Sequence, residues 1–429
     1  MFRKASFGKE DCQHTSLKLL RVTEEWEAPS LEAFLTTKTG RLRASSQSAS
    51  TVANSSSNAT HPANSSALSL EAAELIDERP DERLDTGRLE PYLRAHLPEA
   101  EGPLGVRQFG GGKANLTYLI RFGGPSSYRE FVLRRPPLGP VPPGAHDMAR
   151  EHRVLSVLHR RYKPAPKSLL LCEDPTVIGA VFIVEERRHG FVIRDDIPPP
   201  FENRPDLNRR IGEALIDALA DLHLVPPAEV GLGDLGRPEG YVERQLAGWS
   251  RRWHGALGGP ESEEAQRAMA PALDWLAAHL PQSGAAALLH NDYRLDNCLL
   301  ESADPGHIEA VLDWDMCTQG DPLADLGYVL NYWVEPGDPP EWRGIASMPT
   351  WREGFPSRAE AIARYAERTG SELGPIGWHQ VFAAFKLAAI IQQIYIRFLR
   401  GQTQDQRFRT YGQRVLGLAA KAQRLISET

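Results

Sequence analysis

A short stretch, LLHNDYRLDNCLL, interrupts an apolar run near residue 290 with acids, amides and a histidine. Within it, Asp292 is followed five residues later by Asn297. A second acidic stretch, VLDWDMCTQGDP, begins at residue 311 and places Asp313 at the end of a β-like run. Phosphoryl transfer from ATP needs such a set, because one carboxylate must orient the acceptor hydroxyl while oxygen ligands hold Mg²⁺ against the triphosphate. We therefore predict that Asp292 is the catalytic base and that Asn297 and Asp313 are the metal ligands.

The elements that must position these side chains divide the chain into three parts. Residues 1–84 include a Ser-, Asn- and Thr-rich segment with almost no large apolar groups, which predicts a disordered extension. Residues 85–187 show several strand patterns and one helical pattern, which is typical of a small mixed domain. Residues 188–429 are mainly helical in pattern. We expect an α+β fold with a small β-rich N-terminal lobe, a larger helical C-terminal lobe and a cleft between them.

The two acidic stretches resemble motifs of a known family. HNDYRLDN resembles the catalytic loop of the aminoglycoside phosphotransferase and choline kinase-like family, which is related to protein kinases, and LDWDMCTQGDPLADLGY resembles its metal-binding segment. FVLRRP, REHRVL and LGDLGRPEGYVERQ resemble the subgroup found attached to, or beside, acyl-CoA dehydrogenases. The resemblance runs from about residue 85 to the C-terminus. It implies a bilobal protein-kinase-like fold that uses ATP and Mg²⁺ to phosphorylate a small-molecule hydroxyl.

The segment FGGGKANLTYLI resembles the nucleotide loop of this family. Gly110, Gly111 and Gly112 would let the backbone approach phosphate groups without side-chain obstruction. A triple glycine also suits an ordinary hairpin turn. The order of elements around it favours nucleotide contact.

Further nucleotide-binding residues follow from the resemblance. Arg134 stands where the family has a phosphate-binding lysine, and Glu151 resembles the ion-pair partner of that lysine. Arg135 is the alternative if the strand register differs by one residue, although it would then point to the other face. Glu186 matches the hinge between the lobes, where backbone groups would meet adenine. The change from lysine to arginine replaces a point charge by a planar fork.

Several neighbouring polar residues are expected to support the site. The resemblance implies that His290 braces the catalytic loop through hydrogen bonds, and that Asp321 and Asp325 cap the next helix and brace the loop. Asp315 would touch a second metal or orient Asp313. Two residues stay open between substrate contact and local pairing: Arg294 and Asp296.

The acceptor is less well defined than the nucleotide site. Basic residues in two segments would suit a phosphorylated or CoA-bearing acceptor, or form a solvated basic face: Arg187, Arg188, Arg194, Arg244, Arg251 and Arg252. An anionic cleft suited to cationic aminoglycosides or choline is not evident, so we favour a metabolite hydroxyl, with a hydroxyacyl-CoA as a candidate. The alternative from another class is a nucleotide-binding pseudokinase or scaffold, for which the arginine at position 134 is the best argument.

Composition limits the partners and the compartment. The net charge of −7 over 429 residues argues against a nucleic-acid partner. Four cysteines without CxxC spacing fit a reduced, cytoplasmic setting. The apolar segment VFAAFKLAAIIQQIYIRFLR contains Lys386 and Arg397, and the run between them is too short to span a bilayer. We therefore expect a buried core helix there and no membrane partner.

Overall fold

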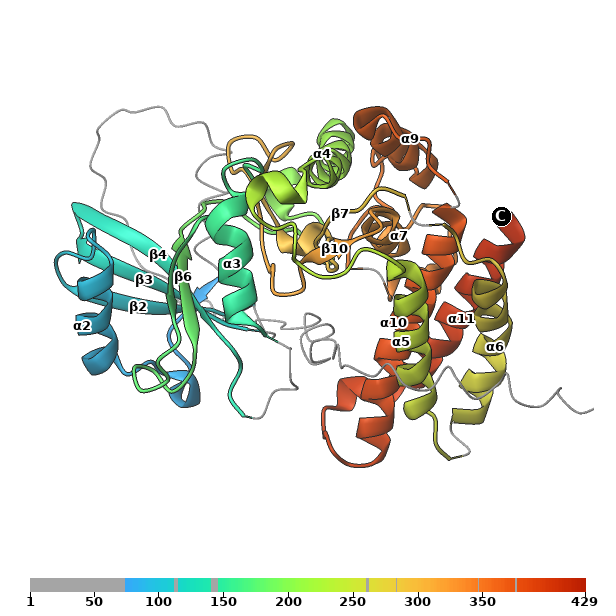
Figure 1. Cartoon of the computed structure of the whole chain (residues 1–429), viewed down its shortest axis with the longest axis horizontal. Helices are drawn as coiled ribbons and strands as arrows, with labels where there is room; N and C mark the ends of the chain where they lie inside the picture. The colour runs from blue at the N-terminus through green and yellow to red at the C-terminus, as the bar shows by residue number, and fades with distance from the viewer. Residues whose placement is uncertain are drawn as a thin grey trace, which may run out of the picture.

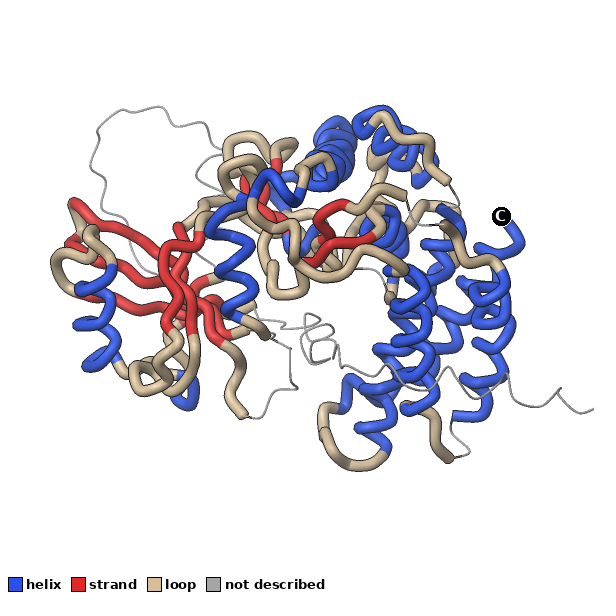
Figure 2. Tube along the Cα trace, viewed as in Figure 1, coloured by secondary structure: helices blue, strands red, loops and turns tan. Residues whose placement is uncertain are grey.

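The computed structural model describes residues 74–111, 115–139, 146–259, 262–282, 284–345, 347–374 and 376–429. These residues form two lobes, with an antiparallel sheet in the first and most of the helices in the second (Figure 1). Figure 2 shows the same division, because the long strands lie at one end of the molecule and the long helices at the other. The expected α+β architecture of two lobes is confirmed.

The first lobe is built on a six-stranded sheet with the order β1-β2-β3-β4-β6-β5. Its strands are β1 (Leu75–Ile76), β2 (Leu104–Phe109), β3 (Leu116–Gly124), β4 (Ser127–Arg135), β5 (Ser168–Cys172) and β6 (Phe182–Glu186). Side chains alternate between the two faces of a strand. Tyr118, Ile120 and Phe122 of β3 are therefore buried together, in one core with Leu89 and Leu93 of helix α2 (Thr86–His96).

The other face of the sheet carries helix α3 (Met148–Leu158) (Figure 1). Residues of this face also line the cavity between the lobes. Thr117 of β3 pairs with Arg134 of β4, and both line the cleft. Arg135 points the other way, is buried, and donates to the carbonyl oxygen of Ile178 at 2.8 Å. The register of β4 therefore selects Arg134, not Arg135, as the cleft residue.

The first lobe begins before residue 85. Leu75 and Ile76 of β1 pair with Phe109 and Gln108 of β2, and a 3₁₀ turn, Pro80–Glu82, follows. The predicted extension through residue 84 was therefore too long by at least the residues 74–84, because strand pairing extends the sheet edge. Residues 1–73 lie outside the described residues.

The second lobe is mainly helical. Its helices are α4 (Pro205–His223), α5 (Tyr241–Gly255), α6 (Glu263–Ala278), α7 (Leu323–Tyr332), α8 (Pro340–Arg343), α9 (Arg358–Thr369), α10 (Ile376–Leu399) and α11 (Tyr411–Glu428). Among the described helices, α10 alone is long and apolar enough to cross a membrane, but 78% of its most apolar window is buried within the fold. This burial agrees with the predicted core helix. Gly327 lets α7 cross α10 closely, since a Cβ there would lie 2.8 Å from the backbone of His379.

Two short two-stranded sheets carry the acidic stretches. Strand β7 (Ala287–Leu289) pairs with β10 (Thr318–Gly320), and β8 (Cys298–Leu300) pairs with β9 (Ile308–Val311). The loop after β7 contains residues 290–297, and the loop after β9 contains Asp313. The two small sheets therefore place both acidic stretches at the lobe boundary.

Candidate active site

The two acidic stretches meet in the cleft. The backbone N–H of Leu312 donates to the carbonyl oxygen of Asn297 at 2.8 Å, which holds the start of β8 beside Asp313. Asp313 has a φ of 71°, and Asn291 in the other stretch has a φ of 67°. Residues other than glycine rarely adopt this left-handed conformation, and it is often found at functional sites. Both stretches therefore contain a residue in the left-handed region, and Asp313 lines the cleft.

The carboxylate of Asp292 is contacted by three side chains. Tyr328 donates its hydroxyl to Oδ1 at 2.8 Å, and Asn297 donates Nδ2 to Oδ2 at 2.9 Å. Arg294 Nε lies 3.3 Å from Oδ1 in an ion pair. Asp292 is thereby fixed in orientation by its own lobe.

His290 and Asp325 brace the catalytic loop, as the resemblance implied. The Asp292 backbone N–H donates to His290 Nδ1 at 3.3 Å, which leaves Nε2 to donate to the Leu312 carbonyl oxygen at 2.9 Å. Nδ1 therefore braces the catalytic loop itself, and Nε2 links that loop to the second acidic stretch. Asp325 accepts the backbone N–H groups of His290 and Asn291 at 2.6 and 2.9 Å. Although burial opposes ionisation, the hydrogen bond from His223 helps to lower the pKa of Asp325.

Arg134 connects the sheet, helix α3 and the second acidic stretch. Its Nη2 lies 3.1 Å from Glu151 Oε1 and 2.7 Å from Asp313 Oδ1. The predicted partner Glu151 is thus adjacent to Arg134. Although burial opposes the charge, Glu151 and Asp313 raise the pKa of Arg134 above its ordinary value. Burial likewise opposes the charge of Asp313, but Arg134 lowers the pKa of that carboxyl.

Asn115 is a site residue that sequence reasoning missed. It is buried directly before β3, and its Nδ2 lies 3.5 Å from both Asp313 Oδ1 and Asp315 Oδ2. His146 holds the other end of the amide, with Nδ1 at 2.8 Å from Asn115 Oδ1. Burial and the neighbouring Asp313 raise the pKa of Asp315 well above its ordinary value. Asn115 therefore links the glycine-turn side of the cleft to the second acidic stretch.

The donor set fits a magnesium ion. Asn297 uses Nδ2 to bond Asp292, so its amide oxygen remains as a ligand, and Asp313 supplies a carboxylate lining the same cavity. Mg²⁺ prefers oxygen ligands and takes only one or two carboxylates from the protein. Burial and the neighbouring acids Asp313 and Glu151 raise the pKa of Asp315. A cation bound beside these acids would offset their mutual repulsion.

The glycine turn lies over the same cleft. The backbone N–H of Gly110 donates to the carbonyl oxygen of Glu74 at 2.8 Å. A Cβ on Gly111 would lie 2.8 Å from Nη2 of Arg194, so glycine there permits this close approach. Arg194 also pairs with the Glu74 carboxylate at 2.6 Å. Gly112 lies outside the described residues.

The hinge carries two adjacent acids with different surroundings. Glu186 accepts the backbone N–H of Lys167 at 2.9 Å and the Nε of Arg188 at 2.8 Å. Its side chain thus stabilises the hinge. Glu185 is buried, and burial together with the nearby Glu151 raises its pKa to about 8.

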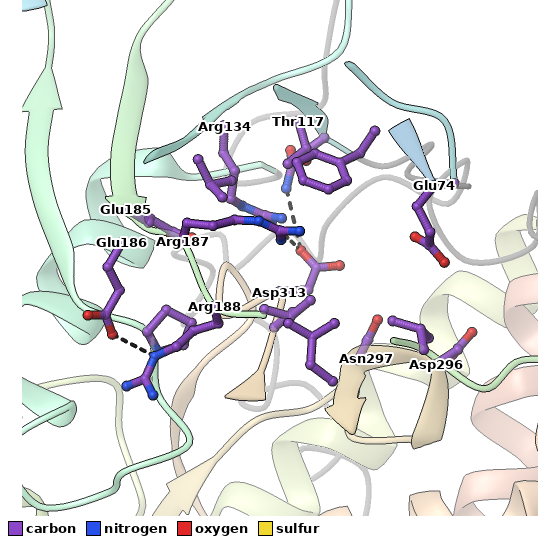
Figure 3. Close-up of a pocket in the computed structure, with 18 of the residues that line it drawn as sticks. Glu74, Thr117, Arg134, Glu185, Glu186, Arg187, Arg188, Asp296, Asn297 and Asp313 are labelled. Carbon is purple, nitrogen blue, oxygen red and sulfur yellow. Dashed lines mark hydrogen bonds and ion pairs between the residues drawn. The ribbon is translucent and has the colours of Figure 1, made fainter. Parts of the chain in front are cut away.

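Figure 3 shows how the cavity brings these residues together. Arg134 approaches Asp313 from the first lobe, and Asn297 lies on the second-lobe side. The cavity is lined by the glycine turn, the sheet, the hinge and the catalytic loop, including Gly111, Thr117, Arg134, Glu186, Asn297 and Asp313. Asp292 does not line this cavity but is joined to it through Asn297. The predicted residues thus gather at one site, apart from Gly112.

Comparison with known proteins agrees with this arrangement. The sequence profile of the phosphotransferase enzyme family matches residues 105–369. The chain belongs to this family. It is 32% identical over 361 residues to acyl-CoA dehydrogenase family member 11 of Gallus gallus, an alignment that covers 80% of this chain and 44% of that protein. The chain spans less than half the length of the curated relatives that it matches first.

Solved structures show the same fold as this chain. A crystal structure assigned to an aminoglycoside phosphotransferase of Ralstonia eutropha is 31% identical, with a TM-score of 0.68, and covers 81% of this chain and 99% of its own. A GDP complex of aminoglycoside 2′-phosphotransferase-IIIa is 13% identical, with a TM-score of 0.52, and covers 79% and 99%. The first supports the family and the second supports the fold alone.

Two residues of the site, Tyr328 and Asn115, were hard to identify from the sequence. Tyr328 lies in GDPLADLGY, but its bond to Asp292 depends on how α7 packs behind the catalytic loop. Asn115 lies three residues after the triple glycine, so its position was the available signal. The predicted basic set is largely paired internally, because Arg188 bonds Glu186 and Glu309, and Arg194 bonds Glu74.

Proposed function

We propose that this chain transfers the γ-phosphoryl group of ATP, as its Mg²⁺ complex, to the hydroxyl of a small metabolite. The observation that carries the proposal is the convergence of Asn297, Asp313 and Arg134 on one cavity, with Asp292 held against Asn297. Phosphoryl transfer depends mainly on positioning and charge neutralisation, and this set supplies both.

The residues divide the work between the two substrates. Asp292 orients the acceptor hydroxyl and receives its proton, and two hydrogen bonds and an ion pair hold its carboxylate in place. Asn297 and Asp313 would hold Mg²⁺, which neutralises the charge on the phosphates when bound. Arg134, steadied by Glu151, would contact the phosphates from the first lobe.

Arg134 also raises the question of how nucleotide enters. Its guanidinium lies 2.7 Å from Asp313, the predicted metal ligand. A bound Mg²⁺ would compete for the same carboxylate, so Arg134 would exchange Asp313 for phosphate oxygens while keeping Glu151. An arginine fork has enough donors for both partners. This capacity favours a working phosphate contact over the pseudokinase alternative.

The finer proposal for the acceptor is a hydroxyacyl-CoA. The relatives reported above are acyl-CoA dehydrogenase family members. Their names support an acyl-CoA compound as the substrate that we propose. We propose a small molecule as the partner of this chain, and neither a nucleic acid nor a membrane. The internal pairing of Arg188 and Arg194 weakens the basic set as independent support.

Product analysis tests the proposal. The protein is incubated with Mg²⁺–ATP and a panel of hydroxylated acids, their CoA thioesters, choline and kanamycin, and phosphorylated products are identified by mass spectrometry. We expect a phosphorylated acyl compound that depends on Mg²⁺. Nucleotide binding without product across the panel would favour the pseudokinase, and an absence of nucleotide binding would contradict both readings.

A further inference from the structure

A buried lysine beside the catalytic loop has no polar partner. Lys386 lies on α10 and is 9% exposed. Within the described part of the chain, its ammonium makes no hydrogen bond or ion pair, and its contacts are with the rings of Trp249 at 5.6 Å and Tyr328 at 4.8 Å. Burying an ammonium without a hydrogen-bonding partner is costly. The acceptor for this ammonium must therefore come from solvent or from a ligand in the cavity that Lys386 lines.

The lysine is close to the reacting end of the site. Tyr328, whose ring faces the ammonium, donates its hydroxyl to Asp292 Oδ1. Lys386 also lines a small cavity with Gln245, Asn291 and Tyr328, next to the catalytic loop. Because α7 crosses α10 closely at Gly327, the separation between Lys386 and Asp292 is set by helix packing. A group bound at Lys386 would thus lie near the acceptor hydroxyl.

The nearby carboxylates do not serve as its partners. Asp292 is occupied by Tyr328, Asn297 and Arg294, and Asp325 is occupied by two backbone N–H groups. Both acids interact with Lys386 only over a longer distance. Burial lowers the pKa of Lys386 to about 8, so the group remains mostly charged near neutral pH.

A second buried lysine shows what a partnered one looks like. Lys421 on α11 is 3% exposed and also faces a ring, that of Trp342 at 4.5 Å. Unlike Lys386, it donates to the carbonyl oxygen of Asn331 at 2.6 Å. The two lysines share burial and a cation–π contact. They differ in that Lys421 is satisfied by the fold whereas Lys386 is not.

We infer that Lys386 binds an acyl oxygen of the acceptor, either the carboxylate of a hydroxy acid or the carbonyl of its thioester, while the hydroxyl of the same molecule faces Asp292. This inference rests on the proposed phosphotransfer and names its acceptor class. The ammonium supplies donors to an electron-rich oxygen and repels cationic acceptors. It also occupies the faces of Trp249 and Tyr328 that would otherwise attract a quaternary ammonium such as choline. Lys386 is thus a specificity-determining residue.

Calorimetric titration in the presence of Mg²⁺–ADP tests this assignment without requiring turnover. The probes are 3- and 4-hydroxybutyrate, 4-hydroxybutyryl-CoA and 4-aminobutan-1-ol, which carry the hydroxyl with an anionic, a neutral acyl or a cationic end. Lys386→Met removes the charge at similar length, Lys386→Gln keeps a donor without charge, and Lys421→Met is the matched control. Thermal melting and Mg²⁺–ADP affinity establish that each variant is folded.

We expect the wild type to bind an acyl probe and to reject the amino alcohol. Lys386→Met should weaken acyl binding by about 10- to 100-fold, the loss expected for one hydrogen bond to a charged group. Lys386→Gln should fall between, and Lys421→Met should match the wild type. Preference for the free acids or for the thioester identifies the source of the oxygen.

Equal acyl binding by the wild type and both Lys386 variants would overturn the inference. Failure of the nucleotide-loaded wild type to bind any acyl probe would overturn it as well, and would leave the proposed phosphotransfer standing. Failure to bind Mg²⁺–ADP at all would instead count against the proposed function.

Discussion

The catalytic loop lies within the second lobe, whereas the group formed by Arg134, Glu151 and Asp313 joins both lobes. Hydrogen bonds made by His290, Asp325 and Tyr328 fix the loop around Asp292. Charged hydrogen bonds connect Arg134 to Glu151 and Asp313. The loop is therefore set before any ligand arrives, while the charged group must exchange a partner when Mg²⁺ and phosphate bind. Substitutions in the two regions should separate turnover from nucleotide binding.

The largest effect is expected from Asp292→Asn. Loss of the general base should lower kcat by about 10²- to 10⁴-fold, whereas the affinity for Mg²⁺–ATP should change little. Steady-state kinetics and calorimetry measure the two quantities. Asp304→Asn is the control. Asp304 is a surface acid on the turn before β9, and it pairs with Arg210 of α4. Equal turnover in wild type and Asp292→Asn would remove Asp292 from its assigned role.

Arg134→Met should have the opposite effect to Asp292→Asn, because it should mainly weaken nucleotide binding. Removing the guanidinium leaves Glu151 and Asp313 as uncompensated buried acids, which costs about 3–5 kcal/mol for buried ion pairs. Arg134→Lys should recover part of the stability, since it keeps the charge but loses the fork. Urea unfolding and nucleotide titration report both effects. A Met variant as stable as the wild type would show that the ion pairs contribute nothing net.

Asp325→Asn tests the hydrogen bonds behind the loop. The neutral amide would lose the charge in two hydrogen bonds to the backbone N–H groups of His290 and Asn291. We expect about 1.5–3 kcal/mol of destabilisation. Because these bonds orient the loop, kcat should fall with little change in nucleotide affinity. Nucleotide affinity that fell as far as kcat would indicate that the loop and the charged group are coupled.

The smallest effect concerns pH. Burial raises the pKa of Glu185 to about 8, from an unfolded value near 4.5, and among the described residues its Oε1 has no hydrogen-bond partner. The folded state therefore binds the extra proton, so stability is full below pH 4.5 and is lost as pH rises toward 8. Glu185→Gln should remove this slope and make the protein more stable than the wild type at pH 8. Melting curves from pH 5 to about 9 would show parallel slopes if the acid were already ionised.

The motif spacing predicted the residues that share one local segment. Asp292 and Asn297 are five residues apart on one loop, and strand alternation favoured Arg134 over Arg135. These inferences succeeded because local geometry fixes them. The start of order near residue 85 was wrong, because β1 is only two residues long and is held by pairing with β2.

Residues whose roles depend on packing between distant elements were not predictable in the same way. Tyr328 reaches Asp292 only because α7 packs behind the catalytic loop. Lys386 first appeared only as a charge that argued against a membrane helix, yet its exposure and its missing partner emerge from the contact of α10 with α5 and α7. A lone lysine in an otherwise apolar helix was the available signal.

Calorimetric titration of ATP, with and without Mg²⁺, into the wild type and Asp313→Ala tests the central claim most directly. The account predicts tight binding by the wild type that requires Mg²⁺ and that Asp313→Ala abolishes, while the control Asp304→Ala binds normally. Binding that is independent of Mg²⁺, or equal in wild type and Asp313→Ala, would contradict the assignment of this cleft as a metal-dependent phosphotransfer site.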